Sequence, residues 1–301
     1  MPLLLSTPSR YMLSSLIWRG QLSSWASDSG SMARLSLELL GTGTSTGVPT
    51  IGCACAVCTS TDPLNKRLRS SALVRSSAAG GQAATAVVID TPPDFRQQML
   101  RSQVQRLDAV VITHGHADHV AGLDDVRRYN VMQNARLDCW ATPETLAVLQ
   151  RSFGYAFADD NNLLKGLPCL RPRPLAFGRT FSVGGLRFEA LALDHTVLMS
   201  TGLIISSAGS PALAYCIDVK RFPPESLSRL KGVHTLVLDM LRETPHPTHL
   251  SLREALDVVE RVAPERAYLA HIAHEVEHRQ LEARLPPHVR LAYDGLIVEL
   301  G

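Results

Sequence analysis

The fold is decided by residues 110–119, which read VVITHGHADH. The apolar run at the start is too short for a typical helix, and four potential metal ligands follow it within six residues. We therefore predict a buried strand over 108–113 that presents these ligands at its carboxyl end. His114 and His116 are two residues apart, so both imidazoles lie on one side of an extended chain. Asp118 and His119 then begin a predicted helix, whose apolar stripe consists of Val120, Leu123 and Val126.

The spacing of His114, His116, Asp118 and His119 resembles the HxHxDH signature of the metallo-β-lactamase superfamily. Imidazoles and a carboxylate suit Zn²⁺ and are also acceptable ligands for Mn²⁺ or Fe²⁺. Two alternatives without metal chemistry are a surface histidine cluster and a helix N-cap by Asp118. The motif cannot complete two metal coordination shells, so further ligands must come from elsewhere in the chain.

Composition places the chain among ordinary globular proteins. It has 301 residues, of which 45% are hydrophobic and 19% charged, enough to bury a large core. The formal net charge of +2 argues against a strong electrostatic field for nucleic acid or a membrane surface. No apolar run approaches the roughly 20 residues that span a bilayer.

The first 31 residues differ from the rest of the chain. They contain Arg10, Arg19 and many serines and leucines, but no acidic residue before Asp28, which resembles an organelle transit peptide. A misassigned extension ahead of Met32 and a disordered bacterial tail are the alternatives. We expect one domain over 32–301 and a cytoplasmic protein, or a mitochondrial or other organellar one if the segment is a transit peptide.

Strand-like and helix-like segments alternate in both halves of the chain. Helices are predicted from Pro92 to about Leu100 and over 143–153, 223–230, 251–262 and 276–285, and residues 154–168 are expected to be a lid or a surface insertion. The predicted strands are 35–40, 71–75, 85–90, 108–113, 137–141, 180–183, 186–193, 201–206, 213–217, 235–241 and 266–270, with a hairpin of 289–293 and 296–300 joined at Asp294-Gly295. This order suits two sheets packed face to face with helices outside, the four-layer αββα arrangement of the α/β class.

Three further polar residues follow apolar strands directly. They are His195, Asp218 and His271. Each alone is equally well explained as a turn residue or a core histidine, but metal ligands gathered at one edge of a sandwich need rigid strands behind them. The superfamily resemblance implies that one metal takes His114, His116 and His195, the second takes Asp118, His119 and His271, and Asp218 bridges both.

A cysteine cluster marks a second metal site. Cys53, Cys55 and Cys58 form a C-x-C-x-x-C pattern that supplies three thiolates, whereas structural zinc needs four ligands. His274, three residues after His271, is the best candidate for the fourth ligand. Reactive or disulfide-forming thiols are the alternative. The other cysteines lie singly in apolar surroundings, which suits a reducing compartment.

These motifs together resemble the cyclic phosphate phosphodiesterases of the carbon–phosphorus lyase pathway, over roughly residues 35–300. That resemblance implies a general-acid role for His249, which precedes a helix start marked by the capping box of Ser251 and Glu254. A solvated loop histidine is the alternative for His249, and His246 is a weaker rival for the role. Nothing in the sequence identifies a substrate pocket.

The expected function is metal-dependent hydrolysis of a small or cyclic phosphodiester. A hydroxide held by two divalent ions, Zn²⁺ or Mn²⁺, would attack phosphorus, with Asp118 in the catalytic centre and His249 protonating the departing alkoxide. We further expect one structural Zn²⁺, a small-molecule substrate, no nucleic-acid polymer or membrane as partner, and a homodimer as one oligomeric option. The alternatives are a superfamily hydrolase of a thioester, lactam or RNA, an oxidative protein like those of pyrroloquinoline quinone biosynthesis, and a non-catalytic zinc-stabilised module.

Overall fold

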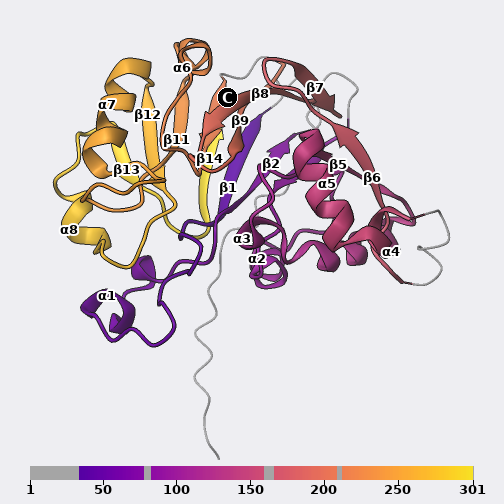
Figure 1. Cartoon of the computed structure of the whole chain (residues 1–301), viewed down its shortest axis with the longest axis horizontal. Helices are drawn as coiled ribbons and strands as arrows, with labels where there is room; N and C mark the ends of the chain where they lie inside the picture. Colours follow the sequence, from indigo (N-terminus) through magenta and orange to yellow (C-terminus); the bar gives the residue numbers. More distant parts are fainter. Residues whose placement is uncertain (1–33, 78–82, 159–165, 209–211, 301) are drawn as a thin grey trace, which may run out of the picture.

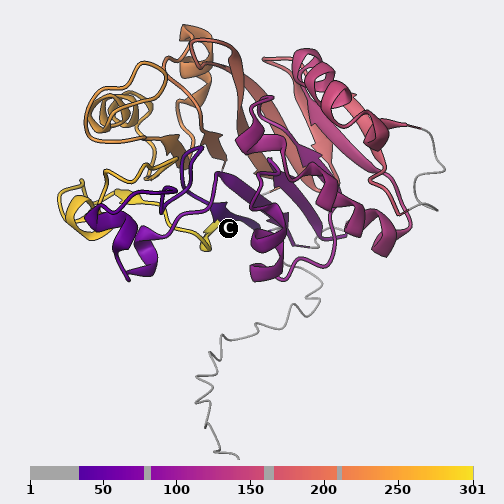
Figure 2. The same ribbon diagram turned by 60° about the horizontal axis from the view of Figure 1, so that its bottom comes forward.

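Two mixed β-sheets face each other in the computed structural model, with helices covering the outer face of each (Figures 1 and 2). The structure describes residues 34–77, 83–158, 166–208 and 212–300. Within these residues the architecture is the predicted αββα sandwich, so this prediction is confirmed.

The first sheet combines an antiparallel half with a parallel half. Its strand order is β14-β1-β2-β3-β4-β5-β6, and the pairs from β3 to β6 are parallel. Its strands are β1 (Leu35–Gly41), β2 (Ser71–Ser76), β3 (Thr85–Ile89), β4 (Ala109–Val111), β5 (Leu137–Ala141), β6 (Leu170–Pro174) and β14 (Leu296–Leu300). On its outer face lie α2 (Phe95–Arg101), α3 (Ala117–Val120), α4 (Arg127–Gln133) and α5 (Pro143–Ser152), with the 3-10 turns η2 (Leu123–Val126) and η3 (Gly154–Phe157).

The second sheet repeats this plan. Its order is β13-β12-β11-β10-β9-β8-β7, antiparallel from β7 to β10 and parallel from β10 to β13. Its strands are β7 (Thr180–Val183), β8 (Leu186–Asp194), β9 (Met199–Ser207), β10 (Leu213–Cys216), β11 (Thr235–Asp239), β12 (Arg266–Ala270) and β13 (Val289–Leu291). It is covered by α6 (Pro224–Leu230), α7 (Leu252–Val262) and α8 (His278–Glu282), while α1 (Ala56–Thr59) and η1 (Pro63–Asn65) belong to a long loop after β1.

The alternation of side chains along each strand divides the core into layers. Leu37 and Leu39 of β1 and Val111 of β4 pack between the sheets, whereas Leu73 of β2 and Val110 of β4 pack beneath the helices. A strand with apolar neighbours on both faces must be apolar throughout. This explains why the sequence leading to His114 is a continuous apolar run.

The last two strands correct the predicted hairpin. β13 pairs with β12 in the second sheet, and β14 pairs with β1 in the first, so the two strands never pair with each other. The carboxylate of Asp294 accepts hydrogen bonds from the backbone N–H groups of Thr42 and Leu68 at 2.9 and 2.7 Å. The Asp294-Gly295 turn therefore carries the chain from one sheet to the other, and the hairpin prediction is wrong.

Other element boundaries also differ from the prediction. Strand β6 was not predicted, because its arginines and prolines lack a strand pattern, and α8 is shorter than the expected helix over 276–285. The segment 154–168, expected to be a lid or a surface insertion, begins with the 3-10 turn η3. Residues 159–165 of this segment lie outside the described residues. The segment 1–31 lies outside them as well. No helix in the described ranges is both long and apolar enough to cross a bilayer.

The helix predicted after the histidine motif is interrupted at Gly122. The three stripe residues Val120, Leu123 and Val126 are buried as predicted, but α3 ends at Val120 and the chain continues as η2. The N–H of Gly122 donates to the carbonyl of Thr91 at 2.9 Å, and a Cβ at this position would lie 2.1 Å from the carbonyl oxygen of Pro92. The close approach of these two backbones requires glycine.

Gly122→Ala is therefore expected to lower the free energy of unfolding by about 1–3 kcal/mol through overpacking. The matched control is Gly154→Ala, because a Cβ there meets nothing within 4 Å and the backbone does not require a positive φ. The control should change stability by less than about 0.5 kcal/mol in urea denaturation. Equal stability of both variants would contradict the tight packing at Gly122.

Candidate metal centre

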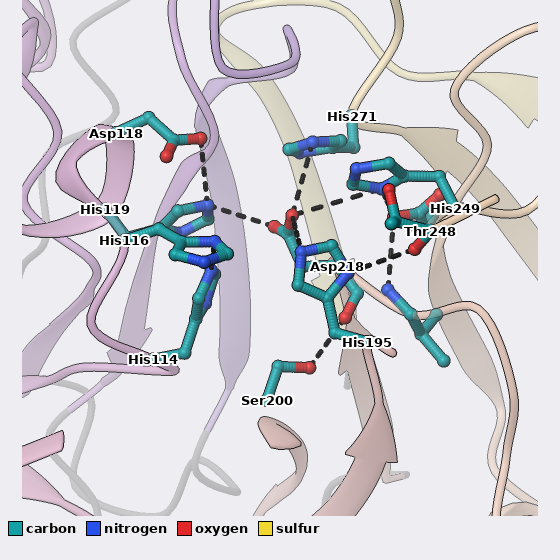
Figure 3. Close-up of polar contacts among 12 residues, drawn as sticks. His114, His116, Asp118, His119, His195, Ser200, Asp218, Thr248, His249 and His271 are labelled. Atoms are coloured by element: carbon teal, nitrogen blue, oxygen red, sulfur yellow. Dashed lines mark hydrogen bonds and ion pairs between the residues drawn. The ribbon is translucent and has the colours of Figure 1, made fainter. Parts of the chain in front are cut away.

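The predicted ligands meet at one edge of the sandwich, contributed by both sheets (Figure 3). The first sheet brings the motif 114–119 after β4. The second sheet brings His195, Asp218 and His271 from the ends of β8, β10 and β12. The carboxyl ends of parallel strands lie on the same edge of a sheet, which is why these side chains converge.

One group consists of three imidazoles. Nε2 of His114 lies 3.0 Å from Nδ1 of His116, and the ring of His195 is 5.6 and 5.4 Å from these two rings. The candidate ligand atoms of the three residues all lie within 4.8 Å of one another. They can therefore surround a single ion.

A second group surrounds Asp218. Nε2 of His119 lies 3.0 Å from Oδ2 of Asp218 and 3.4 Å from Oδ2 of Asp118, and Nε2 of His271 lies 3.4 Å from Oδ1 of Asp218. His195, from the first group, is 3.6 Å from the same Oδ1. The structure thus brings all seven predicted residues together, with the Asp218 carboxylate between the two groups.

The donor set fits divalent cations. Nε2 of His119 and Oδ2 of Asp218 are buried and face each other, yet neither has a hydrogen-bond partner in the described structure. Buried polar atoms are almost always paired, so two such atoms in one place indicate a missing partner. Nitrogen and carboxylate ligands in this arrangement are those that Zn²⁺ and related ions prefer.

Burial and charge act in opposite directions on these groups. Burial raises the pKa of Asp218, but the charges of His271 and His119 outweigh it, so the pKa lies well below its usual value. Burial lowers the pKa of His114. Burial also acts to lower the pKa of His119, but the negative charges of Asp218 and Asp90 have the larger effect. The pKa of His119 therefore lies well above its usual value. A carboxylate held ionised between imidazoles is suited to share cations.

Outer hydrogen bonds orient the imidazoles. Nδ1 of His119 bonds to the carboxylate of Asp90 at 2.7 Å, Nδ1 of His195 to the carbonyl of Thr248 at 3.0 Å, and Nδ1 of His271 to Oγ of Ser70 at 3.0 Å. Partners of this kind fix the tautomer of a ligand histidine and leave Nε2 free for the ion.

Asp90 is a further candidate residue of this site, and the sequence analysis does not predict it. Besides His119, its carboxylate accepts hydrogen bonds from the N–H and the hydroxyl of Thr113, both at 2.8 Å. It is fully buried at the end of β3 and has a positive φ of 62°. The signal was present, since an acidic residue directly after an apolar strand is the same pattern that identified Asp218.

His249 is buried beside the metal centre and is not a solvated loop residue. Its ring lies 4.8 Å from those of both His195 and His271. Nδ1 bonds to Oδ2 of Asp239 at 2.9 Å and lies 4.0 Å from Oδ1 of Asp218. Burial lowers the pKa of His249, but the charge and hydrogen bond of Asp239 outweigh it and raise the pKa. Asp239 is a second residue that the sequence reasoning missed.

The cysteine cluster assembles with the predicted histidine. Nδ1 of His274 lies 3.3, 3.5 and 3.6 Å from the Sγ atoms of Cys53, Cys55 and Cys58. Hydrogen bonds from the N–H of Cys58 and from His274 lower the pKa of Cys55 to about 6, so this group favours the thiolate. The other cysteines, Cys139, Cys169 and Cys216, are buried and form no disulfide within the part of the chain that the structure describes.

Comparison with known proteins agrees with this geometry. A family model described as "Beta-lactamase superfamily domain" matches residues 85–272. The crystal structure of a protein described as a new diphosphatase from the PhnP family is 37% identical, with a TM-score of 0.78, and the match covers 89% of this chain and 98% of that one.

Two curated relatives carry other names. An octanoyltransferase of Porphyromonas gingivalis is 35% identical over 260 residues, covering 86% of this chain and 50% of that protein, so the chain spans about half the length of this relative. The coenzyme PQQ synthesis protein B of Methylorubrum populi is 26% identical over 226 residues, covering 68% and 72%. The superfamily consists mainly of metal-dependent hydrolases that use divalent ions, chiefly zinc.

The family match over 85–272 contains the histidine motif, Asp90, His195, Asp218 and His271, and the fold and the convergence of these residues agree with it. The chain therefore belongs to the metallo-β-lactamase superfamily.

Proposed function

We propose that this hydrolase cleaves a small or cyclic phosphodiester at a centre of two divalent ions. The observation that carries the proposal is the convergence of two ligand groups on Asp218 with the His249–Asp239 pair directly beside them. The likeness to the PhnP-family diphosphatase supports a phosphoryl substrate. We place one ion with His114, His116 and His195, and the other with Asp118, His119 and His271.

Bound divalent ions supply Lewis-acid chemistry, activating water near neutral pH and neutralising charge on phosphoryl oxygens. The chain itself supplies the proton. Asp239 binds Nδ1 of His249, so the transferable proton is on Nε2. The carbonyl of His249 also accepts from Nζ of Lys220 at 3.2 Å, which fixes the residue at both its ring and its backbone. His249 thus protonates the departing alkoxide.

Two other activities have specific support. The likeness to a 37% identical diphosphatase favours cleavage of a diphosphate linkage, which needs the same ions and the same attack on phosphorus. Acyl transfer, named for the Porphyromonas relative, has weaker support because the match covers half of that protein. A dinucleoside diphosphate and an octanoyl thioester therefore belong in the substrate panel, beside bis-p-nitrophenyl phosphate and a 2′,3′-cyclic nucleotide.

Asp118→Ala is expected to abolish diesterase activity and to lower the metal content, because Asp118 lies 3.4 Å from His119 Nε2 in the second ligand group. Mass spectrometry should find about three metals per wild-type chain and at least one tightly held zinc in the variant. One metal per wild-type chain, together with inactivity on every phosphoryl substrate, would overturn the proposed function.

His249→Ala is expected to lower kcat for a 2′,3′-cyclic nucleotide by about 10²- to 10⁴-fold, because the poor alkoxide leaving group needs a proton. The loss should be much smaller with bis-p-nitrophenyl phosphate, whose leaving group is stable as an anion. Metal content should not change. The control is His288→Ala, which changes an exposed histidine outside the site. Its kcat and metal content should equal those of the wild type. Metal loss in the His249 variant equal to its activity loss would contradict a general-acid role.

We further propose that Cys53, Cys55, Cys58 and His274 hold a structural zinc. Cys58→Ala should remove about one zinc per chain and lower the thermal midpoint substantially, since such sites add binding free energy to folding. Cys139→Ala is the control, because it makes the same substitution at a cysteine that is buried away from the cluster. It should leave the zinc content unchanged. Unchanged zinc content in the Cys58 variant would favour the thiol or disulfide alternative.

A further inference from the structure

His246 occupies the position next to the proposed general acid, on the outer side. It lies on the loop between β11 and α7, and its ring is 5.3 Å from that of His249. His249 is buried against His195 and His271, whereas His246 is half-buried. A molecule bound at the metal centre that extends past His249 towards solvent therefore reaches His246.

The hydrogen bonds of His246 fix its tautomer. Nδ1 lies 3.3 Å from the backbone N of Thr248 and 3.2 Å from its hydroxyl oxygen. A backbone N–H can only donate, so Nδ1 is the acceptor and the proton of the neutral ring is on Nε2. Burial and the neighbouring charges of His249 and Arg242 lower the pKa of His246, which favours this neutral form.

The Nε2–H group of His246 is available to a ligand. Within the described ranges Nε2 of His246 has no hydrogen-bond partner, whereas the nearby cations are occupied. Nζ of Lys220 binds Glu254 at 2.6 Å, and Nη1 of Arg242 binds Glu275 at 3.1 Å. His246 thus offers an unengaged N–H donor beside the general acid.

A general acid must be within hydrogen-bond reach of the leaving oxygen, so the leaving fragment lies against His249. We propose that His246 binds this fragment through Nε2–H and selects for leaving alcohols that carry a further hydroxyl or ring oxygen, as a furanose does. The inference rests on the proposed phosphodiester hydrolysis and deepens it. His246 is a substrate-binding residue in this account, and the proton is transferred by His249.

Two substitutions separate binding from a structural role. His246→Asn keeps an acceptor near the position of Nδ1, so the N–H of Thr248 remains paired, but it removes the outer donor. His246→Gln places an amide N–H near the position of Nε2. Both variants are compared with the wild type on a 2′,3′-cyclic nucleotide, whose leaving oxygen belongs to a ribose, and on bis-p-nitrophenyl phosphate, whose leaving fragment has no hydroxyl.

His246→Asn should lower kcat/KM for the cyclic nucleotide about 10-fold, mainly through KM, which corresponds to the loss of one hydrogen bond worth about 1.4 kcal/mol. The nitrophenyl ester should be affected less than about 2-fold, and His246→Gln should recover part of the loss. Metal content and the thermal midpoint, which report on folding independently of turnover, should equal those of the wild type.

Equal losses on both substrates in the Asn and Gln variants, or unchanged selectivity in His246→Asn, would overturn the inference while leaving the proposed function intact. A wild-type protein that hydrolyses neither phosphodiester would instead remove the proposed function, and this inference with it. The two failures are therefore distinguishable.

Discussion

The buried carboxylate of Asp218 is the interaction on which the site depends. It is 2% exposed and lies within 3.0–3.6 Å of nitrogen atoms of His119, His271 and His195. An ionised carboxylate is costly to bury unless cations or hydrogen bonds compensate for lost hydration. Asp90 and Asp239 add two further buried acidic side chains behind this shell. Divalent ions at the imidazoles would supply the compensating charge and would thereby couple metal binding to folding.

Three residues of the site adopt a backbone conformation that is unfavourable for any residue with a side chain. Asp90, Asp218 and His271 each follow a strand, at the ends of β3, β10 and β12, and have positive φ values of 62°, 57° and 63°. For residues with a side chain this conformation costs about 1–2 kcal/mol each, and glycine would adopt it freely. A glycine has no ligand to offer. Strain at three strand ends in one centre is typical of functional sites that the surrounding fold holds in place.

The sequence predicted those parts of the fold and the site whose pattern is compatible with one structure alone. An apolar run followed by a dense ligand motif specified β4 and its histidines, and polar residues after apolar strands identified Asp218 and His271. Asp90 and Asp239 also come at the end of apolar runs, but they fall inside the predicted strands 85–90 and 235–241, so the pattern does not separate them from strand residues. Pairing partners were unpredictable, because the turn at Asp294-Gly295 serves a hairpin and a crossing between sheets equally well. Long-range contacts decide between them: β14 pairs with β1, and Asp294 accepts hydrogen bonds from Thr42 and Leu68.

The two candidate metal regions are linked through the segment that follows β12. The N–H of Ile272 donates to the carbonyl of Thr42 at 2.8 Å, and the N–H of Thr44 donates to the carbonyl of Ile272 at 3.2 Å. Directly before Ile272, the ring of His271 bonds to Ser70, and two residues after it His274 meets the three cysteines.

Three residues of this segment, His271, Ile272 and His274, are thus held by loops more than 200 positions earlier in the chain. Bringing together segments so distant in sequence costs loop-closure entropy, and a cation that binds only the folded state would offset part of this cost. A cation bound by the cysteine cluster would therefore help to hold a ligand of the other centre in register, although it takes no part in the chemistry there.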